Sequence, residues 1–360
     1  MAIKKNVIKT DIASYRHYWR GVKKVGKSTL FRDLVLQEYG TEDAGLLISF
    51  ADEEGYKSLD KLQYEVIEEW IKAEDKDGNR GFKQLVDDLV KNRNTDYADI
   101  KLISYDTYDK MLEVGTKEVL REHTIEKGQP CKSINDAFGG FNRGVDRLKT
   151  MIQEQTSRLE KAGYGVIAIG HTKYKEKKDK IAGDSFEQIT SSLRQDLDAV
   201  FADTAHVVMT ITVDNVIEDN KLVGTKRVMH FRDDGLVDCG GRFSNIPESM
   251  PLGAKEYVEA FNIGVKNSFL KPVDDKTIEK MKEDELKQRE SSAKDYIAQD
   301  EDEDDKAELL KSIVENFSKS ATQQKNEVKE KLKEFKILNF KDVKLFEKEQ
   351  LEEILSILNA

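Results

Sequence analysis

The chain has 360 residues, of which 38% are hydrophobic and 36% charged, with a formal net charge of −10. This composition is typical of a soluble protein with a sizeable core, and no apolar run approaches the roughly 20 residues that span a bilayer. The sequence therefore predicts no membrane segment. The first residues lack the apolar region of a secretory signal, and Cys131 and Cys239 lack disulfide-type or zinc-type spacing. We expect a protein of the reducing cytoplasm.

Most of the negative charge is local. Residues 281–305 hold eleven Asp and Glu against four Lys and Arg, so this segment alone carries −7 of the net −10. Because the remaining residues are nearly neutral, the net charge does not exclude basic patches that bind nucleic acid.

Up to about residue 235, short apolar runs alternate with helical periodicity. Strands are predicted at residues 44–50, 99–106, 163–171 and 206–213. Several are apolar on both faces, as in a parallel sheet covered by helices. Helices are predicted over 28–40 and 146–163, and two strand-like runs follow between 221 and 238. This order predicts an α/β fold with a mainly parallel sheet flanked by helices.

From residue 271 the composition changes to Lys, Glu, Asp, Ser and Gln, with the acidic run DEDEDD at 300–305. Such a segment is too polar to form a core, and we expect a linker or an exposed helix over 271–305. Leucine and isoleucine recur at helical spacing beyond it. The predicted domains are a core at 1–270, the acidic segment at 271–305 and a helical module at 306–360.

The stretch GVKKVGKS at 21–28 matches the phosphate-binding pattern G-x-x-x-x-G-K-[ST], between a β-prone stretch and a helix. In such a loop, backbone N–H groups surround a polyphosphate, the lysine reaches the β and γ phosphates, and the hydroxyl ligates Mg²⁺. The predicted nucleotide-binding residues are Gly21, Val22, Lys23, Lys24, Val25, Gly26, Lys27, Ser28 and Thr29, with Asp106. The alternative is an ordinary turn. Lys23 and Lys24 either line the phosphates or face water.

Carboxylates follow two of the predicted strands. Asp106 ends the run LISYD, where a Walker B aspartate that holds Mg²⁺ belongs. Asp52, Glu53 and Glu54 follow the earlier run LLISF, and one of them can activate the attacking water. The alternative is an ordinary acidic loop.

The order of these pieces, with INDAFGGFNRG, GVIAIGHTKYK and GGRFSNIPESMPL, resembles the phage RecA-like P-loop ATPases over residues 12–262. More narrowly, it resembles the Sak-type single-strand annealing and recombination ATPases. The resemblance implies a RecA-like core that uses ATP and Mg²⁺. It assigns Lys27 and Ser28 to phosphate and Mg²⁺, Asp106 to Walker B, Glu54 to water activation with Glu53 as its rival, and His171 to a sensor of the γ-phosphate. Val22 stands where partition-type ATPases carry a lysine, which disfavours that class.

Basic and aromatic residues supply candidate contacts to single-stranded DNA. The run HTKYKEKKDK suits a loop that binds phosphates, with Lys173, Lys175, Lys177 and Lys178, and a glycine-rich loop adds Phe141 and Arg143. A solvated surface turn is the alternative. RecA-like ATPases form rings or filaments in which a cation reaches the neighbouring nucleotide. Strand alternation places Lys226 and Arg232 on one face, as candidates for that cation.

The sequence thus predicts a DNA-stimulated ATPase of phage recombination, annealing or replication, acting as a homo-oligomer on single-stranded DNA. A single-stranded DNA-binding or other recombination protein is a further expected partner. A P-loop small-molecule phosphotransferase and a scaffold that binds ATP without hydrolysing it are the alternatives. We see no arginine-rich lid of the phosphotransferase type.

Overall fold

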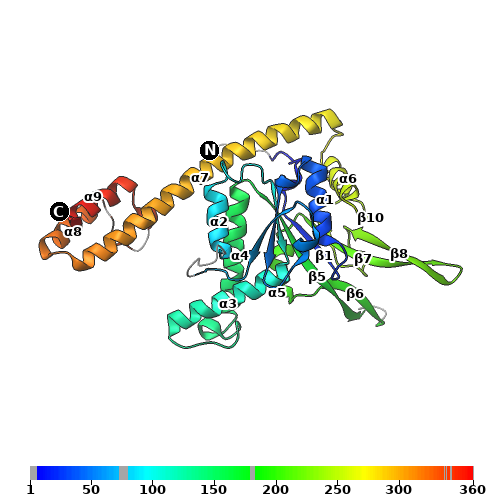
Figure 1. Cartoon of the computed structure of the whole chain (residues 1–360), viewed down its shortest axis with the longest axis horizontal. Helices are drawn as coiled ribbons and strands as arrows, with labels where there is room; N and C mark the ends of the chain where they lie inside the picture. The colour runs from blue at the N-terminus through cyan, green and yellow to red at the C-terminus, as the bar shows by residue number, and fades with distance from the viewer. Residues whose placement is uncertain are drawn as a thin grey trace. The chain divides into compact units, whose positions relative to one another are not determined.

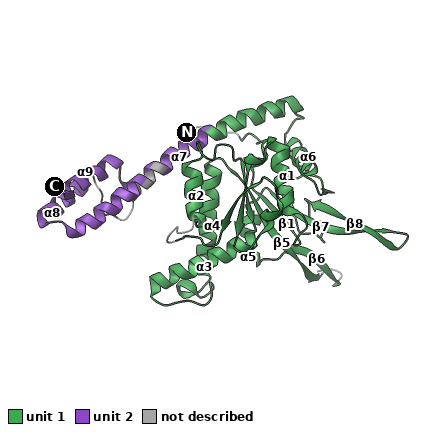
Figure 2. Ribbon diagram, in the orientation of Figure 1, with its two compact units in different colours: residues 1–290 green, residues 291–360 purple. Residues whose placement is uncertain are grey.

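The structure is a computed structural model that describes residues 6–72, 80–178, 183–335, 337, 339–340 and 343–359. The chain divides into two compact units, residues 1–290 and 291–360 (Figure 2). None of the helices in the described ranges is long and apolar enough to cross a membrane.

A mainly parallel sheet organises the first unit (Figure 1), in the order β10-β8-β7-β1-β5-β4-β2-β3. Its strands are β1 (His17–Gly21), β2 (Gly45–Phe50), β3 (Gln63–Ile67), β4 (Leu102–Asp106), β5 (Gly165–Lys178), β6 (Ser185–Ser191), β7 (Val207–Glu218), β8 (Lys221–His230), β9 (Gly240–Gly241) and β10 (Ser249–Pro251). The six strands from β7 to β3 in that order run parallel, whereas β6, β8, β9 and β10 pair antiparallel. The predicted α/β fold is confirmed.

Helices cover both faces of this sheet. They are α1 (Lys27–Tyr39), α2 (Phe82–Lys91), α3 (Tyr108–Lys127), α4 (Arg143–Lys161), α5 (Gln195–Ala202) and α6 (Ala254–Lys266). Helices α1 and α6 pack in one hydrophobic core with alternate residues of the central strands, such as Ile167 and Met209. On the other face, Tyr105 of β4 packs edge-on against Phe82 of α2 and Phe201 of α5. Parallel strands buried on both sides explain the apolar runs of the sequence.

The polar first strand, HYWRG, is buried along its whole length. Toward α6, the Trp19 indole donates to the Tyr257 hydroxyl at 2.9 Å, and that hydroxyl lies 2.7 Å from Nδ1 of His17. Burial lowers the pKa of His17 to about 4. Toward α5, Tyr18 donates to Asp198 at 2.9 Å. A tyrosine, a tryptophan and a histidine can fill a core when their polar tips find partners.

A 45-residue helix, α7 (Asp275–Lys319), begins in the first unit and ends in the second. Within the first unit, Glu285 accepts hydrogen bonds from the N–H of Thr10 at 2.6 Å and from Ser14, and Arg289 pairs with Asp11 at 2.6 Å. The second unit adds α8 (Thr322–Glu334) and α9 (Lys348–Asn359) around a small core that includes Ile313, Leu332 and Ile354.

The structure corrects the prediction for the lysine-rich segment. Thr172–Lys178 is no loop, because β5 continues past the sheet and pairs antiparallel with β6 as a projecting hairpin. The strand continues because its alternating residues find a partner ladder in β6. The last part of the predicted run, residues 179 and 180, lies outside the described residues.

Two smaller predictions also change. Arg143 is the first residue of α4 rather than part of a loop. Arg232 follows the last residue of β8, His230, so it does not share a strand face with Lys226. In both cases the sequence pattern placed the end of an element a few residues away from its end in the structure.

Candidate functional site

The phosphate loop joins the carboxyl end of β1 to the first turn of α1. Gly26 takes φ 106°, a left-handed conformation that favours glycine, and directly precedes Lys27, the first residue of the helix. A Cβ on Gly21 would lie 3.0 Å from Val25 and 3.1 Å from the backbone of Ile211. Both glycines are therefore required by conformation or by space. The free N–H groups of the first helical turn point toward the loop, as an anion site needs.

Lys27 is buried inside this loop. Its ammonium donates to the carbonyl oxygens of Gly21 at 2.8 Å and Val22 at 3.0 Å. Burial lowers the pKa of Lys27 to about 8, against the opposing effect of nearby carboxylates, first of all Asp106. The lysine lies where it can meet phosphate oxygens. By contrast, the side chains of Lys23, Lys24 and Thr29 are exposed, Val22 is 39% exposed and Val25 is buried.

Ser28 and Asp106 meet across the sheet edge. The Ser28 hydroxyl donates to Oδ2 of Asp106 at 2.7 Å, and burial raises the pKa of Asp106. A Cβ on Gly55 would lie 3.2 Å from that carboxylate oxygen and 3.4 Å from the hydroxyl. A hydroxyl and a carboxylate beside a glycine, where a side chain would be crowded, suit Mg²⁺, which prefers oxygen ligands. Ser28 and Asp106 would hold the ion, which when bound neutralises phosphate charge.

The three carboxylates after β2 differ in exposure and in ion pairing. Glu54 is exposed and pairs with Lys57, and Asp52 pairs with Lys110 at 2.8 Å. The Glu53 side chain is half-buried, and its charge acts on the pKa of both Lys27 and Asp106. Of the three carboxylates, Glu53 is thus the one whose charge acts on both Lys27 and Asp106 and whose side chain has no ion pair with a neighbouring lysine among the contacts of the described residues.

His171 is the register partner of Gly21, so it lies at the same edge of the sheet as the loop. The backbone N–H of His171 donates to Oδ2 of Asp109 in α3 at 3.1 Å. The hydroxyl of Ser192, just after β6, donates to Oδ1 of the same carboxylate at 2.6 Å. Burial would raise the pKa of Asp109, but the hydrogen bonds from His171 and Ser192 outweigh it and lower this pKa. Asp109 therefore joins both ends of the β5–β6 hairpin to the helix that starts beside Asp106.

A second cation lies near the loop. A Cβ on Gly26 would be 3.7 Å from Nη1 of Arg227 on β8, and Arg227 is exposed. Its neighbour Lys226 points to the other side of the strand, as alternation requires, and is the register partner of Asp214. Arg232 is 51% exposed and lies 3.9 Å from Glu248.

The predicted DNA-contact residues lie apart from the phosphate loop, on projections. Phe141 is 93% exposed with φ 53°, and Arg143 donates to the carbonyl of Phe138 at 3.2 Å. A bulky residue with positive φ is rare, and such strained positions occur preferentially at functional sites. The side chains of Lys173, Lys175, Lys177 and Lys178 are exposed on the β5–β6 hairpin.

Sequence reasoning missed three residues of this site. Asp109 stands three residues after Asp106, in the run DTYD, and that spacing was its only signal. Gly55 ends the run DEEG, and nothing in the sequence marks it as the neighbour of Ser28. Arg227 could not be separated from Lys226 without the register of β8.

A comparison with protein families supports this geometry. The model of the AAA domain family matches residues 13–243, well over half of the chain. A search of curated proteins finds no match. The matched range contains the phosphate loop, Asp106, His171 and the projecting hairpins. The chain belongs to the AAA domain family of P-loop ATPases, whose members bind nucleotide.

Proposed function

We propose that this protein hydrolyses ATP and acts on single-stranded DNA in phage recombination, annealing or replication, as the sequence resemblance implies. One observation carries the proposal. Strand β5 runs from His171, beside the phosphate loop, directly into the lysine hairpin, and Asp109 fixes both ends of that hairpin. A change at the nucleotide can therefore reach the lysines through a short, contiguous set of contacts.

The surroundings of the hairpin fit a DNA-binding edge. The tip between α3 and α4, the β5–β6 hairpin and the β7–β8 hairpin all project from the sheet (Figure 1). Asn135 in the α3–α4 tip accepts from Arg194, which follows β6, at 3.0 Å. Exposed lysines attract phosphates and an exposed Phe141 can stack on an unpaired base. Ligands of α/β proteins bind at this carboxyl edge of the strands.

The proposed roles follow from the contacts. Lys27 and the N–H groups of α1 bind the phosphates, Ser28 and Asp106 hold Mg²⁺, and Glu53 orients and deprotonates the attacking water. Arg227 contacts the phosphates of the nucleotide in its own subunit. The protein works as a homo-oligomer, a ring or a filament, in which Lys226 or Arg232 remains a candidate for reaching the neighbouring nucleotide.

The test measures ATP hydrolysis with and without single-stranded DNA, together with DNA binding at low salt. We expect hydrolysis that rises with DNA, and a loss of more than about a hundredfold in Lys27→Ala because the phosphates lose their buried cation. Hydrolysis with neither DNA binding nor stimulation would overturn the DNA part of the proposal. Transfer of the γ-phosphate to a small molecule would favour a phosphotransferase, and ATP binding without turnover would favour a scaffold.

A further inference from the structure

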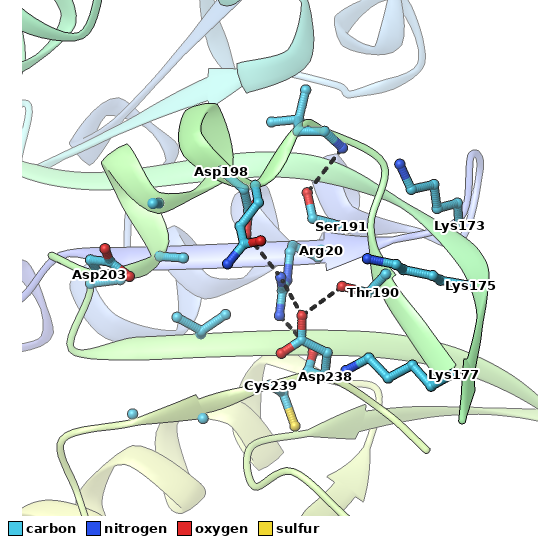
Figure 3. Close-up of a pocket in the computed structure, with 18 of the residues that line it drawn as sticks. Arg20, Lys173, Lys175, Lys177, Thr190, Ser191, Asp198, Asp203, Asp238 and Cys239 are labelled. Atoms are coloured by element: carbon cyan, nitrogen blue, oxygen red, sulfur yellow. Dashed lines mark hydrogen bonds and ion pairs between the residues drawn. The ribbon is translucent and has the colours of Figure 1, made fainter. Parts of the chain in front are cut away.

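A groove of about 1050 Å³ lies between the β5–β6 hairpin and α5, apart from the phosphate loop. One wall carries Lys173, Lys175 and Lys177, and the opposite wall carries Ala199 and Ala202 of α5. Figure 3 shows the three lysine side chains reaching from the hairpin into this groove, Lys175 toward Thr190 and Lys177 toward Asp238. We call it the α5 groove. The residues Lys173, Lys175 and Lys177 share one face of β5 because side chains alternate along a strand.

The floor of the α5 groove is organised by Arg20, which is 1% exposed. Its guanidinium lies 3.4 Å from Asp198 and 3.2 Å from Asp238, and Thr190 donates to Asp238 at 2.7 Å. One guanidinium offsets only one of these two negative charges, and Asp203 is the third carboxylate of the lining. The five cations of the lining are Arg20, Lys173, Lys175, Lys177 and Arg242. Against three carboxylates these five cations leave the lining a net charge of +2, and the lysine wall is the part of it that attracts an anion.

The lysine wall has free charge. Lys173 donates to the carbonyl of Ser192 at 2.9 Å, whereas neither Lys175 nor Lys177 has a hydrogen-bond or ion-pair partner among the described side chains. From Lys173 to Lys177 the strand covers about 13 Å, at roughly 3.3 Å per residue. This row is longer than one phosphate group and suits several phosphates in succession. The length of the lysine row therefore favours a DNA strand over a free nucleotide as the ligand.

The opposite wall has a different chemistry. Ala199 and Ala202 present small apolar side chains. An apolar surface is what the face of an unpaired base packs against, whatever its sequence. The volume is at the upper end of the range for pockets that hold drug-sized molecules, so a whole nucleotide unit fits.

We propose that the α5 groove holds a single strand of DNA with its phosphates on Lys173, Lys175 and Lys177 and at least one base turned toward Ala199 and Ala202. This inference rests on the proposed function, and it adds a base-binding wall that exposed lysines alone do not imply. The bound DNA would lie along β5. Because β5 also carries His171 beside the phosphate loop, this β-strand would connect the DNA with the nucleotide site.

Lys178 is the matched control. The sequence predicts it as a DNA contact beside Lys177, but it points to the other face of β5 and does not line the groove, so this proposal gives it no phosphate. We measure binding of a short oligothymidylate across a salt series for Lys177→Ala and Lys178→Ala. We expect Lys177→Ala to reduce the slope of log affinity against log salt by about one, since one phosphate contact is lost, and Lys178→Ala to leave it unchanged. Equal losses in both variants would overturn the groove as the phosphate site.

The base wall is tested with an abasic oligomer of the same length. Wild type is expected to bind the oligothymidylate at least about fivefold more tightly than the abasic strand, because stacking of one base contributes about 1–3 kcal/mol. Ala202→Phe, which fills the groove, should remove this preference, while Lys177→Ala keeps it. If wild type shows no preference, the base wall is wrong even when DNA still stimulates hydrolysis. If Ala202→Phe fails to fold, two other measurements test the proposal. They are the preference of the wild type for oligothymidylate over the abasic strand and the difference in salt slope between Lys177→Ala and Lys178→Ala.

Discussion

Strand β1 and the outer half of β5 have similarly polar sequences, HYWRG and TKYKEKK, but their side chains have opposite surroundings. In β1 every residue is buried, and Tyr18, Trp19 and Arg20 all have hydrogen-bond partners. In the outer half of β5 the side chains of residues 173–178 are exposed, and Lys175 and Lys177 have no partner among the described residues. Buried polar groups must be paired, whereas exposed charges can stay unpaired until a ligand arrives.

Burial and pairing separate the polar side chains that stabilise the fold from those that are available to a ligand. Arg20 supports the strand that carries the phosphate loop, and its contacts are made within the protein. The lysines of the hairpin gain little by pairing in water, so they remain free for phosphates. The predictions below compare residues that are close in sequence or in chemical type but differ in their surroundings.

The largest effect is expected at the two glutamates after β2. Glu54 is paired with Lys57 and exposed, whereas Glu53 is half-buried near Lys27 and Asp106. Glu53→Gln should reduce kcat by about 10²–10⁴-fold, the usual contribution of a positioned general base, with ATP binding retained. Glu54→Gln should change kcat by less than about threefold.

Steady-state hydrolysis and nucleotide binding of both variants provide the measurement. A large loss in Glu54→Gln with normal turnover in Glu53→Gln would return the catalytic role to the residue that the family resemblance favours. It would also mean that the ion pair with Lys57 opens during the reaction.

An intermediate effect is expected for stability. Arg20→Met should lower the free energy of unfolding by about 2–4 kcal/mol, because Asp198 and Asp238 lose a buried cation but keep some exposure to water. Lys175→Met should stay within about 0.5 kcal/mol. The free energy of unfolding is measured by urea titration with tryptophan fluorescence as the signal, since Trp19 and Trp70 are both buried in the first unit. Equal losses in the two variants would show that the pairing of Arg20 adds nothing.

The sequence predicted the parts of this molecule that depend on local pattern. The glycine and lysine spacing gave the phosphate loop, and the apolar runs gave the central strands, because both signals lie within a few neighbouring residues. The contacts of HYWRG depend on Tyr257 and Asp198, far away in the chain, and no local pattern contains them. The lysine hairpin was missed because its partner strand, SFEQITS, is itself polar.

The smallest effect is expected on β8, where two adjacent cations point to opposite sides. Arg227 lies near Gly26 of the phosphate loop, whereas Lys226 lies across from Asp214. Arg227→Ala should raise the KM for ATP about tenfold with little change in kcat, because one charge-assisted hydrogen bond to a phosphate contributes about 1.5–3 kcal/mol in the bound state. Arg227→Lys should keep part of the affinity. Lys226→Ala should change KM by less than about twofold at protein concentrations where no oligomer forms. If Lys226→Ala instead lowers kcat only at concentrations where the protein assembles, Lys226 acts on the nucleotide of the neighbouring subunit. Turnover would then depend on that contact rather than on the contact of Arg227 with the phosphate loop of its own subunit.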